Sequence, residues 1–482
     1  MSLSLALNTA RSSILTTSAQ VEASARNIAG AGDPSTSRKI AVTTTSAAGG
    51  ATVVQISRAS DAALYTRMIT ATSRTAERQA VQDGLDRLQA AVGDPGGETA
   101  PAARLGALSD ALVQYRNAPD EPAFGSALVT AAQDLTASLH ASAEAVLTLR
   151  RDADQSMVRS VARVNDLLKQ FGVENSAVIK GTAVGGDVTD ALDRRDAIVS
   201  QISEEMGVSA VMRPGNDLVL YSDSGATLFE TTARTVTFQS TPVFDAQTVG
   251  NGVFVDGVAV TGDAATMPLA SGRLAGLTTL RDSVALTYQT QLDETARGLI
   301  ASFAETSASA PTRPGLFTVG DADLAAEATP GLARRLAVAA AADPAKGGSP
   351  SLLRDGGING SDYVVNASGD PGFPDRLQAL SDALTAGRSF DAAGDIATSA
   401  SLIEYSTASA GWLSAQRQAA TTSAATEGAL LSHASNALSN ATGVNMDEEY
   451  AHQLELEHSF QASSKLMAII NQLFDSLLAA IR

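Results

Sequence analysis

Apolar residues recur at intervals of seven near both ends of this 482-residue chain. The repeat has four positions at each end: Leu7, Ile14, Val21 and Ile28, then Phe460, Met467, Phe474 and Ile481. A period of seven is typical of a helix that packs lengthwise against another helix. We therefore expect the two terminal helices to form a coiled coil, and these eight side chains to form an assembly interface.

Helical periodicity also fills most of the chain between its ends. It predicts helices at 3–29, 61–92, 105–115, 124–149, 157–171, 188–206, 277–303, from 377, at 400–440, and from a cap at Asn445. Alternating apolar residues around turn residues predict β-hairpins at 38–58, 208–221 and 253–260. The expected fold is mostly α, with a bundle of long helices and a nested β-rich insertion.

The N-terminal and C-terminal segments are expected to contribute to the same domains. This order therefore predicts that the middle of the chain is nested inside those domains. The expected parts are an inner coiled coil (1–33 with 445–482), a helical bundle (34–180 with 271–305 and 376–444), a β-rich outer domain (181–270), and an irregular part of that outer domain (306–375).

Composition narrows the possible partners. The net charge of −18 disfavours nucleic acid and anionic membranes, because both are negatively charged. The chain has no cysteine, which excludes disulfides and thiolate metal sites. No apolar run is long enough to span a membrane, and residues 1–10 do not resemble a cleavable signal peptide.

Signatures of enzymes are mostly missing, and we expect neither catalysis nor a cofactor. Glu449-x-x-His452 and Glu455-x-x-His458 match the spacing of di-iron bundles, but they lie on one helix with faces about 120° apart. Solvated polar faces explain them better than a metal site. The acidic run 447–449 is explained by the dipole at a helix N-terminus.

The last helix carries a second set of apolar residues: Leu466, Ile469, Ile470, Leu473 and Leu477. A helix that is apolar on more than one face needs more than one partner. Neighbouring copies of the chain can supply that partner, and heterologous contacts between copies build rings or filaments.

Several of these segments resemble the hook-associated protein 1 family (FlgK) of the bacterial flagellum. The segment 27–34 resembles the family's Asn-Asn-Ile-Ala-Asn-Ala-Asn-Thr-Pro element, with Arg26 in place of the first Asn, and 443–449 resembles its Gly-Val-Asn-Leu-Asp-Glu-Glu. Interior segments are also similar to the family: 117–120, 191–196 with 207–209, and 271–282. The usual Pro-Gly-Tyr-Ser-Arg is replaced here by Pro34 and the residues Ser-Thr-Ser-Arg.

The resemblance implies a structural subunit of the junction between the flagellar hook and filament, outside the cell. It implies a ring of copies, the hook protein and a second junction protein as neighbours, export without a cleaved signal, and a cytoplasmic chaperone on the C-terminal segment.

Two alternatives remain open from the sequence. One is another flagellar axial protein, such as a hook, rod or second junction subunit. The other is a secreted or cytoplasmic enzyme with its site in residues 207–375.

Overall fold

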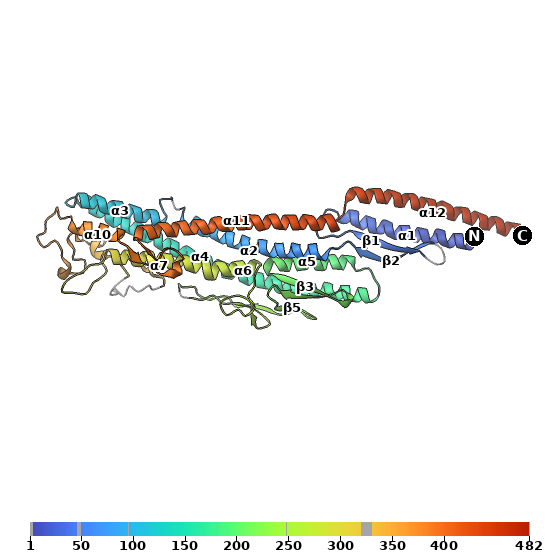
Figure 1. The fold of residues 1–482 in the computed structure, drawn as a ribbon, viewed down its shortest axis with the longest axis horizontal. Coiled ribbons are helices and arrows are strands. Elements are labelled where there is room, and N and C mark those ends of the chain that lie inside the picture. Colours follow the sequence, from blue (N-terminus) through green and yellow to red (C-terminus); the bar gives the residue numbers. More distant parts are fainter. Residues whose placement is uncertain (1–2, 46–49, 95, 247, 320–329, 482) are drawn as a thin grey trace.

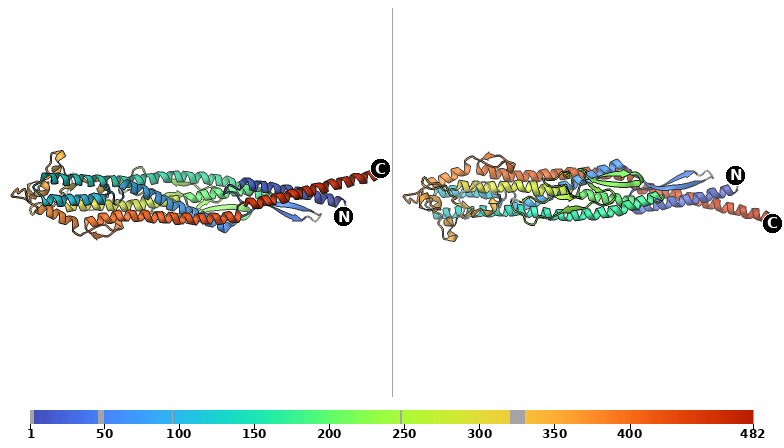
Figure 2. Two further views of the ribbon diagram at one scale, coloured as in Figure 1. Left: turned by 90° about the horizontal axis from the view of Figure 1, so that it is seen from above. Right: turned by 90° about the horizontal axis from the view of Figure 1, so that it is seen from below.

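The computed structural model describes residues 3–45, 50–94, 96–246, 248–319 and 330–481. The molecule is a long rod, and most of its helices run parallel to the long axis (Figure 1). Both termini lie at the same end of the rod, where a narrow extension projects from a thicker body (Figure 2).

The described helices are α1 (Leu3–Gly30), α2 (Ala62–Val92), α3 (Pro101–Asn117), α4 (Pro122–Ala183), α5 (Thr189–Glu205), α6 (Arg273–Thr279), α7 (Ala285–Ser302), α8 (Leu332–Arg335), α9 (Leu352–Asp355), α10 (Asp375–Thr385), α11 (Leu402–Thr442) and α12 (Met446–Ile481). A π-helical turn, Leu280–Val284, joins α6 to α7.

The described strands are short: β1 (Lys39–Thr45), β2 (Ala51–Arg58), β3 (Val208–Arg213), β4 (Asp217–Ser222), β5 (Thr227–Phe229), β6 (Val236–Phe238), β7 (Val253–Val255), β8 (Val258–Ala259), β9 (Phe317–Thr318), β10 (Ala337–Val338), β11 (Arg388–Ser389) and β12 (Ser399–Ala400). They pair as β1–β2, β3–β4–β5, β6–β7–β8, β9–β10 and β11–β12, always antiparallel.

The three expected hairpins are confirmed. Strands β1 and β2 form the first, β3 and β4 the second, and β7 and β8 the third. The turn of the third is Asp256-Gly257, and both residues have positive φ (50° and 84°). These values fit a two-residue turn, which explains why Asp-Gly is favoured there. The mostly helical fold with small β insertions is confirmed as well.

Two of the expected helices are in fact one. The segments 124–149 and 157–171 both belong to α4, which runs for 62 residues. The polar stretch between them looked like a break, but Arg150 and Asp154 are buried. Arg150 donates to the carbonyl of Arg281 (3.2 Å), and Asp154 accepts from the Arg281 guanidinium (2.7 Å). These contacts satisfy the polar groups without interrupting the helix.

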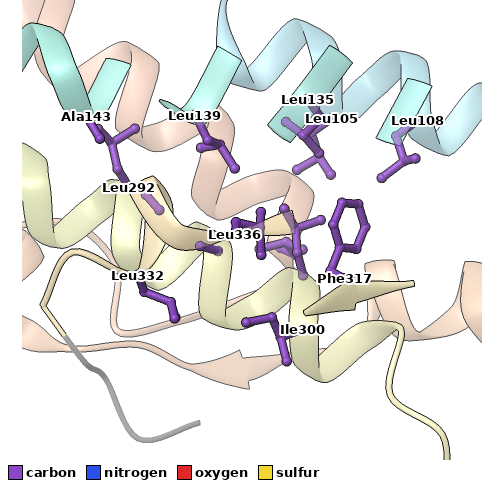
Figure 3. Close-up of a cluster of buried hydrophobic side chains, with 14 of the residues drawn as sticks. Leu105, Leu108, Leu135, Leu139, Ala143, Leu292, Ile300, Phe317, Leu332 and Leu336 are labelled. Atoms are coloured by element: carbon purple, nitrogen blue, oxygen red, sulfur yellow. The ribbon is translucent and has the colours of Figure 1, made fainter. Parts of the chain in front are cut away.

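The body has two hydrophobic clusters, one after the other along the rod. The first joins α3, the first half of α4, α7 and α10 with the start of α11. Figure 3 shows part of it, with Leu139, Leu292 and Leu336 converging from different segments. The second cluster joins the second half of α4 and α5 to the strands β4–β7.

The placement of residues 306–375 corrects the sequence prediction. We expected this segment to extend the β-rich outer domain, but its buried side chains, including Phe317, Leu336 and Leu353, belong to the first cluster. The β-rich segment packs in the second cluster. Apolar residues spaced irregularly between glycines and prolines gave no period from which their partner could be predicted. Residues 320–329 of this segment lie outside the described part.

The hairpin β1–β2 also changes the expected domain boundary. We assigned it to the helical bundle, but it packs against α1. The Thr16 hydroxyl, for example, donates to the carbonyl of Ala51 (2.7 Å). We propose to divide the molecule into a body (59–443) and a terminal arm, which consists of α1, β1–β2 and α12.

Candidate assembly arm and its polar joint

Helices α1 and α12 pack side by side along the arm and run in opposite directions (Figure 1). The Ser13 and Ser463 hydroxyls are 2.8 Å apart, and the Ser24 hydroxyl donates to a Glu449 carboxylate oxygen, also at 2.8 Å. Residue numbers therefore increase along α1 in the direction in which they decrease along α12, so the two helices are antiparallel. This pairing of the chain ends agrees with the expected terminal coiled coil.

The face that α1 turns toward its partners is small and polar. Its buried residues include Ala10, Thr17 and Ser24, which are also spaced by seven. The expected seam of Leu7, Ile14, Val21 and Ile28 lies beside this line, and all four side chains are only half-buried. A single chain therefore covers most of the apolar repeat of α1 and leaves a part of each of these side chains exposed.

Helix α12 buries one face against α1. Glu449, Leu456, Ser463 and Ile470 are buried at intervals of seven. Of the expected seam, Met467 and Phe474 border this line and are half-buried, while Phe460 is exposed. The side chain of Ile481 lies outside the described residues. Ile470, which we placed on the second apolar face, lies on the buried one.

The remaining apolar residues of α12 form an outer stripe, which we define as Leu466, Ile469, Leu473 and Leu477. Their side chains are 45–53% exposed. In addition, the last turns of α12 extend past the start of α1, so the end of the helix projects beyond its partner (Figure 2). Exposed, contiguous apolar surface of this kind is typical of a protein interaction site.

Glu449 is a residue whose role the sequence did not reveal. Its carboxylate accepts from the Ser24 hydroxyl and from the Asn27 amide (3.0 Å), and it is buried. The acidic run 447–449 indicated only a favourable charge at a helix start, where Asn445 indeed accepts from the amides of Asp447 and Glu448. The only sign of this contact in the sequence was the resemblance to the FlgK family, because Asn27 and Glu449 lie in two of the segments that carry that resemblance.

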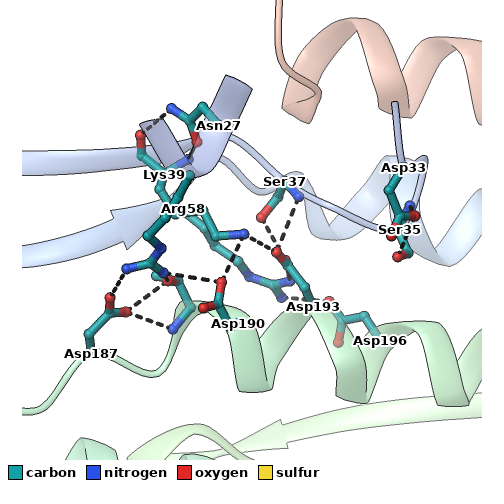
Figure 4. Close-up of polar contacts among 12 residues, drawn as sticks. Asn27, Asp33, Ser35, Ser37, Lys39, Arg58, Asp187, Asp190, Asp193 and Asp196 are labelled. Atoms are coloured by element: carbon teal, nitrogen blue, oxygen red, sulfur yellow. Dashed lines mark hydrogen bonds and ion pairs between the residues drawn. The ribbon is translucent and has the colours of Figure 1, made fainter. Parts of the chain in front are cut away.

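The arm meets the body at a joint made of charged side chains (Figure 4). Four aspartates occur at every third residue in and before α5: Asp187, Asp190, Asp193 and Asp196. We call them the aspartate ladder. Successive carboxylates at this spacing are neighbours on the surface, and along the helix the row winds around α5 by about 60° at each step.

Three cations of the arm each bridge two successive carboxylates of the ladder. Arg26 contacts Asp187 (2.6 Å) and Asp190 (3.1 Å). Lys39 contacts Asp190 (3.3 Å) and Asp193. Arg58 contacts Asp193 (2.8 Å) and Asp196.

Uncharged groups complete the joint. The Ser37 amide and hydroxyl donate to Asp193 at 3.2 and 2.6 Å. The Asn27 side chain donates to the Lys39 carbonyl (2.9 Å) and accepts from the Lys39 amide (2.7 Å), which fixes β1 to the end of α1. Asn27 therefore links α1, β1 and Glu449 of α12 at one point.

The environment shifts the pKa of two carboxyls of the ladder in opposite directions. Burial raises the pKa of Asp196, and the neighbouring Arg58 offsets this only in part. Burial also acts on Asp187, but the hydrogen bonds from Arg26 and Thr189, together with the charge of Arg26, outweigh it and lower the pKa of that carboxyl. The two ends of the ladder therefore differ, because burial dominates at Asp196 and favourable contacts dominate at Asp187.

No other part of the described chain suggests a site for chemistry. Within it, no three His, Asp or Glu side chains lie close enough together to hold a metal ion. His452 and His458 belong to the exposed surface of α12. No helix in the described ranges is long and apolar enough to cross a membrane.

Comparisons with known proteins agree with this picture. The family described as the flagellar hook-associated protein FlgK helical domain matches residues 85–313, which cover much of the body. The family described as the C-terminal part of the flagellar basal body rod FlgEFG proteins matches 435–480, which is α12 and the end of α11.

Individual relatives share shorter segments. The flagellar hook-associated protein 1 of Salmonella typhimurium is 27% identical over 165 residues, which are 34% of this chain and 30% of that protein, and the same values hold for Salmonella typhi. The match thus spans less than a third of these relatives' length. A solved structure of the flagellar hook junction protein FlgK from Burkholderia pseudomallei is similar to this chain, with 20% sequence identity and a TM-score of 0.43. The similar part covers 53% of this chain and 47% of the Burkholderia chain.

An arm of paired terminal helices on an elongated helical body, with a rod-type C-terminal segment, places the chain among the axial proteins of the bacterial flagellum. Within that class, the helical body is similar to the FlgK family of flagellar hook-associated proteins, whose helical domain it matches over residues 85–313.

Proposed function

We propose that this protein is a structural, non-catalytic subunit of the hook–filament junction of the bacterial flagellum. It assembles with copies of itself into a ring and joins the hook to the filament, outside the cell. The observation that carries this proposal is the terminal arm, whose outer stripe on α12 stays about half exposed within a single chain.

The outer stripe of α12 and the half-buried repeat of α1 supply the contacts for assembly in this proposal. Leu7, Ile14, Val21 and Ile28 lie at the edge of the α1–α12 contact, where a neighbouring arm can reach them. Phe460, Met467 and Phe474 extend that surface along α12, and the repeat of seven in the sequence continues to Ile481. Burying apolar area of this kind is the main driving force of protein association.

The other proposed partners are the hook protein on one side, a second junction protein on the filament side, and an export chaperone on the C-terminal segment before assembly. The chaperone suits the outer stripe, because exposed apolar side chains invite aggregation until they are covered. Export then proceeds by the flagellar apparatus without a cleaved signal.

A different axial position, in the rod or hook, is the alternative that the C-terminal match favours, because that match is to the C-terminal part of basal body rod proteins. The body favours the junction, since its match is to the hook-associated helical domain. An enzymatic role in residues 207–375 has no supporting observation.

Deletion of the gene tests the proposal. We expect cells with bare hooks, seen by electron microscopy, and flagellin shed into the medium. Missing hooks would move the protein to the rod or hook, and normal filaments would reject a flagellar role.

A further inference from the structure

Two arginines of α2, Arg67 and Arg74, have no anionic partner in the fold of one copy. Both side chains are exposed, and among the described residues neither forms an ion pair or a side-chain hydrogen bond. Glu77 lies near Arg74, but its contact is with Arg78 (3.4 Å). Because residues seven apart occupy the same side of a helix, the two arginines form a basic line on the surface of the body.

Glu448 and Glu455 of α12 form an acidic line with the same spacing. On each helix the two charges are therefore about 10 Å apart. The glutamate side chains are 65% and 84% exposed, and each has one long contact within the chain, with Arg38 (3.5 Å) and with His452 (4.0 Å). Ion pairs at this exposure are weak, so both carboxylates are available to another partner.

The acidic line continues the outer stripe of α12. At 100° per residue, Glu448, Glu455 and the four residues of the stripe lie within a sector of about 80° around the helix. Ala462, between the two sets, is exposed as well. One continuous face of α12 is thus acidic beside the body and apolar toward the chain end. A partner that covers the stripe therefore also meets the two glutamates.

We propose that this face of α12 docks on a second copy of the chain, with Glu455 against Arg67 and Glu448 against Arg74. Helix α12 runs away from the body, whereas α2 runs into it (Figure 1). In two copies that point the same way, α12 of one is therefore antiparallel to α2 of the other, and this direction gives the stated pairs. The inference rests on the proposed self-assembly and specifies its contacts.

The docking staggers the two copies along the rod. Helices α2 and α12 begin at one level, because Arg38 is hydrogen-bonded through its backbone to Ala59 and to Thr442, which flank the two chain crossings. Glu455 lies nine residues beyond the start of α12, and Arg67 lies five beyond the start of α2. At 1.5 Å per residue, the copies are displaced by about 20 Å.

The two parts of the face contribute differently. Burial of the outer stripe supplies most of the affinity, whereas the ion pairs select the register. In the proposed ring, copies displaced in this way follow a helical path and do not lie at one level.

Cross-linking tests the contact directly, since the chain has no natural cysteine. We would oxidise the purified full chain that carries Arg67→Cys and Glu455→Cys. Within one copy these positions are about 20 Å apart, so a disulfide between them forms only between copies. We expect covalent multimers on a non-reducing gel. The control pair, Arg159→Cys with Glu455→Cys, should give none, because Arg159 is an exposed residue of α4 away from the basic line.

Exchange of the charges tests the register. One chain carries Arg67→Glu with Arg74→Glu, and the other carries Glu448→Arg with Glu455→Arg. We expect each chain alone to need an about tenfold higher concentration to associate, because like charges then face each other. An equal mixture should associate as the natural chain does, because opposite charges meet again in every contact. Arg159→Glu, which makes the same change on α4, should have no effect.

Restored association in the mixture also shows that both chains are folded. Reversed chains that associate like the natural chain would assign the arginines to a different acidic partner and overturn the docking. A mixture that fails to associate, or a cysteine pair that gives no cross-link between copies, would overturn it as well. These measurements use purified chain. Bare hooks after gene deletion, together with no cross-link, would therefore retain the junction role and reject this contact alone.

Discussion

Asp193 shows why the segment 191–196 has its particular sequence. The segment was recognised only through its resemblance to the FlgK family, as a short run of charges. In the structure, Asp193 lies among Ser37, Lys39 and Arg58, all from the arm. The next residues point elsewhere: Arg194 pairs with Glu174, and the buried Arg195 donates to Asn175. A run of charges thus divides into one set for the arm and one for the body.

The pKa of Asp187 makes the joint sensitive to acid. Because Arg26 and the hydrogen bonds from Thr189 lower the folded-state pKa of this carboxyl, these contacts stabilise the fold fully above the unfolded pKa of about 4. This stabilisation is lost as the pH falls through the lowered folded value. We expect the difference in thermal midpoint between the natural chain and Asp187→Asn to be constant from pH 7 to about 5.

Below about pH 4 that difference should shrink toward zero. The exposed substitution Asp120→Asn, away from the joint, serves as the control. A difference that persists unchanged at pH 3 would contradict the assigned ion pair.

Leu336 tests whether the segment 306–375 belongs to the bundle. Its side chain is fully buried among helices of the first cluster (Figure 3). We expect Leu336→Ala to lower the free energy of unfolding by about 2–5 kcal/mol, because it leaves a cavity in a packed core. Leu430→Ala, on the exposed side of α11, should change it by less than about 0.5 kcal/mol. Equal values from urea unfolding would show that Leu336 lies outside the cooperative core.

At the scale of single elements, α12 differs from the other long helices. Helix α4 buries apolar side chains along its whole length, whereas α12 buries one narrow line that includes Glu449 and Ser463. A helix with so little buried apolar area gains little stability from packing in the free chain. Its exposed stripe then becomes the part that association can bury.

Leu473→Asp tests the outer stripe of α12. We expect this charge to prevent assembly, because it would be buried without a partner in the contact between copies. The fold of the body should not change. Gln472→Asp is the matched control, since it adds the same charge to the neighbouring position, off the stripe. The measurement is polymer formation by purified chain, or swimming of cells; normal assembly by Leu473→Asp would exclude the stripe from the interface.

Amide hydrogen exchange on the free chain should rank the helices. We expect the slowest exchange in α4 and α7, faster exchange in α1, and the fastest in residues 474–481, which extend beyond α1. Assembly should slow exchange throughout the arm. Strong protection of 3–29 and 446–481 before assembly would show that the arm is already stable in the free chain, and would contradict this ranking.

At the scale of the whole molecule, core and assembly surface occupy different parts of the rod. Both hydrophobic clusters lie in the body, and the exposed apolar surface of α12 lies in the arm. This separation lets the body be stable before any association of copies, while the arm stays available. The two parts therefore contribute to different properties of the protein.

Removal of the arm tests this separation. We expect residues 59–443 alone to fold with helical content and a main thermal transition close to those of the body in the full chain, because no apolar cluster is cut. The fragment should also stay monomeric in sedimentation at concentrations at which the full chain associates. A fragment that unfolds, or that associates as the full chain does, would contradict the division.

The sequence by itself determined the elements and the class of protein. Helices and hairpins followed from local periodicity and turn residues such as Asp256-Gly257, which act over a few positions of the chain. The pairing of the termini followed from matched heptads. The resemblance to the FlgK family rested on short segments that need no knowledge of contacts.

Only the tertiary structure decided which residues meet across long stretches of the chain. It joined the two predicted helices into α4 through Arg281, placed 306–375 in the first cluster, and brought three arm cations to the aspartate ladder. These contacts link residues more than a hundred positions apart, such as Asn27 and Glu449. Periodicity carries no information on such pairs, because a charged or small residue is equally suited to solvent and to a distant partner.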